Sequence, residues 1–83
     1  MVNLLNKLKE NGLIWLYLVS LISADNLLCP EDCDRAINLL NETIKAIPET
    51  NFTDEEKEKI LKRCNNGLEI CEADKKEFLK NIN

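Results

Sequence analysis

Histidine is absent from this 83-residue chain, which also contains only two glycines and two prolines. Without histidine, the sequence lacks the usual general base and the commonest metal ligand. It has no glycine-rich loop that would hold a phosphate group, and no nucleophile with a base beside it. We therefore expect a protein that is not an enzyme and that needs no cofactor.

Long basic runs are absent as well, because no more than two lysines or arginines follow one another. With a net charge of −4, the chain lacks the clustered basic surface that nucleic-acid binding requires. The charged stretches Lys57–Arg63 and Lys75–Lys80 have the three- and four-residue spacing of solvated helix faces. We interpret both stretches as solvent-exposed helix faces, and we expect that the protein does not bind nucleic acid.

The segment 13–24, L-I-W-L-Y-L-V-S-L-I-S-A, carries no charge, whereas the chain after it is rich in charge. It is too short for a helix that spans a bilayer, which needs about 20 residues. Lys7 and Lys9 precede it and small residues close it, as in secretory signal peptides. We predict that residues 1–24 are a signal peptide and that residues 25–83 are the secreted domain.

Two alternatives stay open for this segment. If it is not cleaved, it anchors the protein to a membrane. If it belongs to the fold, residues 13–24 run through the core of an intracellular helical bundle. An N-terminal amphipathic helix then precedes Gly12 and has its apolar side at Val2, Leu5 and Leu8.

The rest of the chain is rich in leucine, lysine, glutamate and isoleucine and poor in β-branched runs, which favours helices over strands. Pro30 is suited to the first position of a helix, and the acids that follow it suit the first turn. Apolar residues then recur at spacings of four and three until Pro48 ends the run. This pattern predicts one amphipathic helix over residues 30–47.

A second helix begins after the linker, where Thr53 and Glu56 form a capping box. This helix either ends at the segment Asn65-Asn66-Gly67 or continues through it. In the first case a third, short helix begins at Asp74. The fold class is therefore all-α, as a small helical hairpin or a three-helix protein.

The four cysteines lie at positions 29, 33, 64 and 71, all in the charged part of the chain. Zinc sites with four cysteines use two pairs with two to four residues between the partners, and only the first pair here has that spacing. We therefore expect no metal site. A secreted domain of this size commonly needs disulfides, so we predict that two of them staple the hairpin.

The pairing follows from folding the two helices back on each other about residues 50–51, so that facing residues have numbers that sum to roughly 101. The pairs Cys29–Cys71 and Cys33–Cys64 sum to 100 and 97 and are predicted on this basis. A bridge between Cys64 and Cys71 remains possible instead. Two glycosylation sequons fit the same compartment, with Asn51 in the linker a better acceptor than Asn41 on a helix.

One partial pattern spans residues 29–78. Two nearby cysteines, Cys29 and Cys33, are followed by N-F-T-D-E-E-K-E-K-I-L-K-R-C and then by Cys71 and an E-F-L helix. This arrangement resembles the front half of a saposin-like domain, although the first two cysteines have three residues between them instead of two. The final helix of that family, with its last two cysteines, has no counterpart here. The resemblance implies interaction with lipids or membranes.

We therefore expect a small secreted, acidic protein that acts by binding a partner, as an effector, toxin-like peptide or regulator. Removal of residues 1–24 would take away one glutamate and two lysines, which leaves 14 acids and nine bases. The alternatives are a lipid-interacting saposin-like protein and the intracellular bundle. A two-helix hairpin cannot cover its apolar surface alone, so a homodimer is a further expectation.

Overall fold

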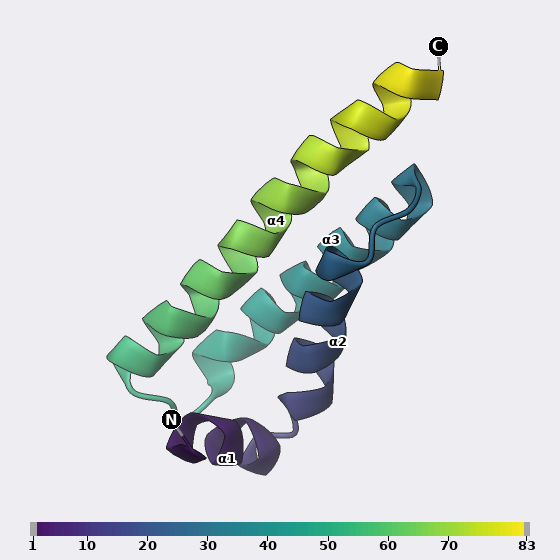
Figure 1. Ribbon diagram of the computed structural model, residues 1–83. Helices are drawn as coiled ribbons and strands as arrows, with labels where there is room; N and C mark the ends of the chain where they lie inside the picture. Colours follow the sequence, from purple (N-terminus) through teal and green to yellow (C-terminus); the bar gives the residue numbers. More distant parts are fainter. Residues whose placement is uncertain (1, 83) are drawn as a thin grey trace.

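The computed structural model describes residues 2–82, and within them the side chains of residues 6–81. This part of the chain is all-helical, which confirms the predicted all-α class, although two N-terminal helices pack with the expected hairpin. It comprises α1 (Val2–Glu10), α2 (Ile14–Asp25), α3 (Pro30–Ala46), the 3₁₀ turn η1 (Ile47–Glu49) and α4 (Asp54–Ile82). Helices α3 and α4 form an antiparallel hairpin, α2 lies along it, and α1 crosses its closed end (Figure 1).

Helix α3 begins as its sequence predicts. Cys29 is extended at the N-cap position without a capping bond from its side chain, Pro30 occupies the first turn, and the backbone N–H of Leu28 donates to Asp32 Oδ2 at 3.1 Å. The helix ends at Ala46, where the turn η1 with Pro48 takes over. The predicted helix over residues 30–47 is therefore confirmed to within one residue at its end.

Helix α4 begins with the predicted capping box. The backbone N–H of Glu56 donates to Thr53 Oγ1 at 3.2 Å, and that of Thr53 donates to Glu56 Oε1 at 2.9 Å. The helix then continues without a break to Ile82. The sequence left open whether this helix ends near Gly67 or continues through it. The structure confirms that it continues, and the prediction of a separate third helix from Asp74 is wrong.

Gly67 lies inside α4 at the point where α3 packs closely against this helix. A Cβ added at Gly67 would lie 3.1 Å from Leu40 Cδ1 and 3.8 Å from the Cβ of Ala24. Such a short distance would force Leu40 to move. The glycine therefore lets α2 and α3 approach α4 more closely than any other residue would allow.

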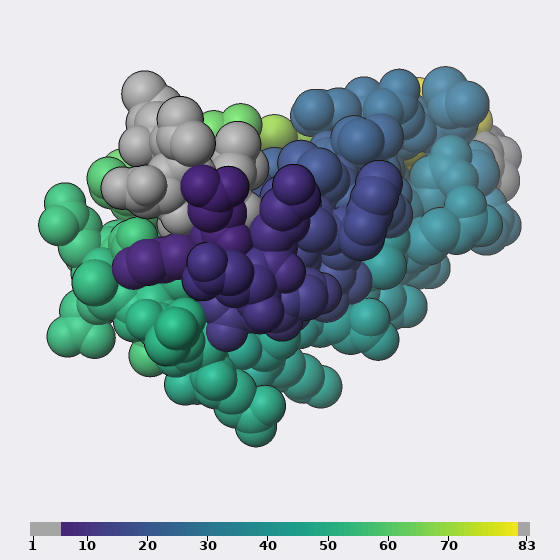
Figure 2. Space-filling view, turned by 90° about the horizontal axis from the view of Figure 1, so that it is seen from below, coloured from purple at the N-terminus to yellow at the C-terminus, as the bar shows by residue number. Residues whose placement is uncertain are grey.

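Helix α1 packs over the turn that joins α3 to α4 (Figure 2). It ends before Gly12, whose φ of 71° lies in the left-handed region that favours glycine, as expected for the break there. Leu8 is buried, whereas the side chains of Val2 and Leu5, the other members of the predicted apolar side, lie outside the described residues.

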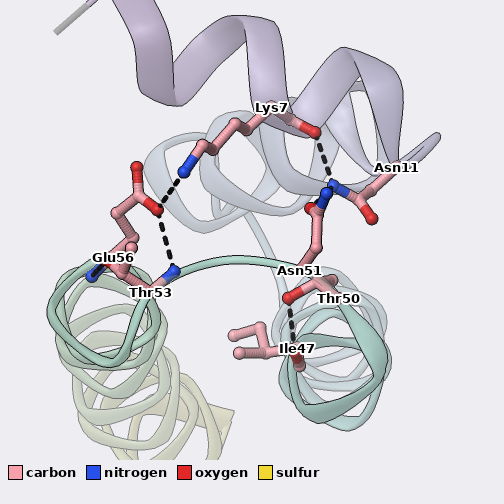
Figure 3. Close-up of polar contacts among 7 residues, drawn as sticks. All are labelled: Lys7, Asn11, Ile47, Thr50, Asn51, Thr53 and Glu56. Carbon is pink, nitrogen blue, oxygen red and sulfur yellow. Dashed lines mark hydrogen bonds and ion pairs between the residues drawn. The ribbon is translucent and has the colours of Figure 1, made fainter.

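Two hydrogen bonds join α1 and the residue after it to the linker and to the start of α4 (Figure 3). Lys7 Nζ donates to Glu56 Oε1 at 2.7 Å, and Asn11 Nδ2 donates to Asn51 Oδ1 at 3.0 Å. The pKa of the Glu56 carboxyl is lowered, first by the hydrogen bond from Lys7 and then by the backbone N–H of Thr53. Glu56 thus links α1 to the start of α4.

This link makes the closed end sensitive to acid. Because the pKa of Glu56 is lower in the folded chain, its contribution to stability is present above its ordinary value of 4.5 and is lost as the pH falls through the folded value. We expect the melting temperature to fall less between pH 7 and pH 3 in the Glu56→Gln variant than in the unaltered protein. Thermal unfolding followed by circular dichroism measures this, with Glu55→Gln as the control. Equal acid sensitivity of the two variants would contradict the assignment.

Candidate functional site

The fully buried residues of α2 are small. Ser20 and Ala24, four positions apart, are buried, and Ser20 Oγ donates to the carbonyl oxygen of Tyr17 at 2.7 Å. The hydroxyl is thus satisfied within its own helix, while Ile14 and Tyr17 are partly buried and also pack against the core. Ala24 lies against the surface of α4 at Gly67.

The outward face of α2 carries its large apolar residues. Trp15 is 75% exposed and Ile22 is 59% exposed, and Leu18 and Val19 lie exposed between them. Spacings of three and four place these four side chains in one stripe. These four side chains forgo the stabilisation of burial, which is worth about 1.5–3 kcal/mol for each large apolar side chain, whereas Ile14 and Tyr17 on the same helix pack against the core.

An open seam separates α2 from α4. One hollow of about 380 Å³ is lined by Tyr17, Lys59, Ile60, Lys62, Arg63 and Asn66. A second, of about 220 Å³, follows along the same seam and is lined by Leu21, Ala24, Asp25, Arg63, Asn66, Gly67 and Ile70. Burial raises the pKa of the Tyr17 hydroxyl, and the positive charge of Arg63 opposes the shift.

The cationic side of this seam was missed by the sequence analysis, which interpreted Lys57–Arg63 only as a solvated face. In the part of the chain that the structure describes, the ion pairs join Lys7 to Glu56, Arg35 to Asp32 and Lys75 to Asp34. None of them involves Lys59, Lys62 or Arg63. The sequence signal was the glycine at position 67, which marks where another helix approaches, with these three cations one and two turns before it.

The packing of α3 against α4 fixes which cysteines are neighbours. Leu40 faces Gly67, and Lys75 Nζ donates to Asp34 Oδ1 at 2.6 Å, so facing residues have numbers that sum to 107 and 109. The expected value of about 101 is therefore wrong. With a sum of 107, Cys33 faces Asp74. Burial raises the pKa of the Cys33 thiol, and the charge of Asp74 adds to the shift.

All four cysteines are free thiols in this structure, so the predicted stapling is not confirmed. The same sum of 107 places Cys71 opposite Ala36 and Cys64 opposite Thr43. The predicted pairs Cys29–Cys71 and Cys33–Cys64 fall seven and ten residues short of that sum, which corresponds to roughly 10 and 15 Å along a helix. Cys33 and Cys71 fall three residues short, or about 4.5 Å.

Three of the thiols are buried within the fold, and Cys29 is partly exposed at its open end. Burial raises the pKa of Cys64 and of Cys71 to about 11, and the charge of Cys33 adds to the shift at Cys71. At neutral pH these groups are protonated, and their thiolates, the reactive species, are scarce.

The two sequons differ in accessibility. Asn51 is exposed in the extended segment before α4, where its side-chain oxygen accepts the hydrogen bond from Asn11. Asn41 is exposed in the middle of α3, but the hydroxyl of Thr43 in the same sequon is buried and donates to the carbonyl oxygen of Leu39 at 2.9 Å. The structure thus favours Asn51 over Asn41 as an acceptor.

Within residues 2–82, no three potential metal-binding side chains come together. Over the same residues, no helix combines the length and apolar character needed to cross a bilayer. In comparisons with known proteins, no family model, no curated protein and no solved structure matches the chain. The saposin-like resemblance therefore stays a prediction.

Proposed function

We propose that the chain is the precursor of a small secreted helical protein that acts by binding a partner and not by catalysis. Residues 1–24 are its signal peptide, and residues 25–83 are the binding module. The observation that carries the proposal is the orientation of α2, which buries Ser20 and Ala24 and leaves Trp15 and Ile22 exposed. A signal peptide is recognised through a continuous apolar segment, so its large residues need not face a core.

The hairpin formed by α3 and α4 supports the same proposal, because its ends and its core lie within residues 25–83. Each helix starts with its own N-cap residue, which is Cys29 for α3 and Thr53 for α4. The buried apolar cluster is drawn mostly from these two helices and their connection, with Ala36, Leu40, Ile47, Phe52, Ile60, Cys64 and Cys71. Removal of residues 1–24 would leave this cluster together, although open on one side.

Stapling of the hairpin by disulfides belongs to the proposal. In the oxidising secretory compartment, an oxidised thiol–disulfide oxidoreductase accepts two electrons and two protons as two thiols form one bond. Cys33 and Cys71 are the pair that requires the smallest shift of α4 along α3. We expect their bridge to form first, with Cys29 beside it at the open end.

Intact mass tests this proposal on protein recovered from a eukaryotic secretory host and alkylated in guanidinium chloride, with and without prior reduction, so that burial does not protect a free thiol. We expect the loss of residues 1–24, alkylation of Cys33 and Cys71 only after reduction, and added glycan mass at Asn51. Asn51→Gln and Asn41→Gln variants serve as a matched pair for the glycan. An uncut chain whose four thiols are freely alkylated would overturn the proposal and favour the intracellular bundle.

A further inference from the structure

Removal of residues 1–24 would uncover a groove between α3 and α4, and α2 fills this groove in the full chain. We propose that this groove is the partner-binding site. Its occupant is an amphipathic helix of another protein, with small residues four positions apart and carboxylates on the flank that lies beside α4. The inference rests on the proposed function, because the groove opens only when the signal peptide has been removed.

The small residues are required by the depth of the groove. At its floor, Leu40 lies so close to Gly67 that a Cβ there would be 3.1 Å from Leu40 Cδ1. A Cβ at that position would also be only 3.8 Å from Ala24 Cβ, so α2 passes directly over the glycine. A leucine in the place of Ala24 would overlap with these atoms, and Ser20, one turn earlier, is 0% exposed, so a leucine there would have to displace its neighbours. Any helix that sits as deeply must carry small side chains at both places.

The carboxylates of the proposed partner helix are inferred from the cations that line the seam between α2 and α4. Lys59, Lys62 and Arg63 line the hollow between α2 and α4, and none of them takes part in the ion pairs of the described residues. Helix α2 carries no acid before Asp25 at its last position, so it leaves these cations without a partner. An occupant with a carboxylate at the position of Leu21, beside Arg63, would complement them.

The first experiment uses the full chain with a site for a sequence-specific protease inserted between Asn26 and Leu28, in the segment between α2 and α3. The folded protein is cut in vitro and passed over a gel-filtration column. The proposal expects either that the cut segment stays bound or that a labelled peptide replaces it. A segment that dissociates, together with a peptide that does not bind, overturns the proposal.

The probes are fluorescent peptides of residues 13–25 in which Trp15, Leu18, Val19 and Ile22 are replaced by glutamine for solubility. Fluorescence anisotropy measures their binding to the cut chain, with the uncut chain as the control whose groove is filled. We expect the double change Ser20→Leu and Ala24→Leu to weaken binding at least about 10-fold. Equal binding of the small-faced and leucine-faced peptides would contradict the groove geometry.

The electrostatic part is tested with a third peptide that also carries Leu21→Glu. We expect it to bind about 2- to 5-fold more tightly than the base peptide at low salt, and this difference to vanish at 1 M NaCl. Arg63→Glu, on the exposed side of α4, should abolish the preference and retain binding of the base peptide. Retention of the preference in this variant would overturn the carboxylate requirement.

These measurements are independent of the test of the proposed function. The mass of the secreted protein reports whether residues 1–24 are removed in the host, whereas the peptides report whether the groove accepts a small-faced helix after a cut made in vitro. A secreted, cleaved protein with an inert groove would overturn only this inference. A groove that binds the peptides in a chain that the host does not cleave would overturn the proposed function and the partner-binding role that rests on it, but would leave the groove geometry standing.

Discussion

Leu40→Ala is expected to destabilise the full-length chain by about 2–5 kcal/mol, the range for deleting a large side chain from a packed core. Leu40 is 0% exposed and lies against α4 at Gly67, which has no side chain that could fill the cavity. A domain of this length has a total stability of about 4–12 kcal/mol. The substitution would therefore remove a large part of it.

Urea unfolding followed by circular dichroism measures the change, and Leu28→Ala is the matched control. Leu28 is 82% exposed in the segment before α3, so its truncation should change the free energy of unfolding by less than about 0.5 kcal/mol. The hydrogen bond from its backbone N–H to Asp32 Oδ2 is kept in the alanine variant. Similar losses for the two variants would show that Leu40 is not at the centre of the core.

The helices and their starts could be predicted from the sequence because their signals are local. Pro30 with the acids behind it determines the start of α3, and the pair Thr53 and Glu56 determines the start of α4. These interactions span three or four residues and depend little on the rest of the fold. The same locality explains why the break at Gly12 was predictable.

The offset between α3 and α4 was not predictable, because it depends on tertiary packing. The 3₁₀ turn Ile47–Glu49 prolongs α3 beyond its last residue, which the linker sequence alone does not reveal. The fit of Leu40 against Gly67 then selects one position along α4. A shift of a few residues in this position separates Cys33 from Cys64, so the disulfide pairs inferred from a symmetrical turn depend on a quantity that sequence spacing does not contain.

The orientation of α2 is a third case. Its sequence is apolar all round, so periodicity gives no preferred inward face. The choice is made where α2 crosses Gly67, because the close approach of Ala24 to this glycine leaves room only for a small residue. The small residues at the end of this segment, Ser20 and Ala24 among them, were interpreted in the sequence as the end of a signal peptide, whereas in the structure both are buried. Both roles use the same property, the absence of a large side chain.

The second large expected effect concerns the thiols of the reduced, full-length chain. Alkylation requires the thiolate, and burial raises the pKa of Cys64 and of Cys71 from 9.0 to about 11. At pH 8 this shift alone lowers the thiolate fraction about 100-fold relative to the unfolded chain. We expect both residues to react with iodoacetamide at least that much more slowly in the folded protein than in guanidinium chloride.

Cys29 provides the internal comparison, because it is the partly exposed thiol of the four. A hydrogen bond from the backbone of Asp32 lowers its pKa, but desolvation and the side chains of Glu31 and Asp32 outweigh that effect and raise it. Its accessibility should nevertheless make it the first residue to be alkylated, as pulse labelling with peptide mass mapping would show. If Cys64 reacts as fast as Cys29 in the folded chain, α2 does not remain seated over the hairpin. The groove would then open without cleavage.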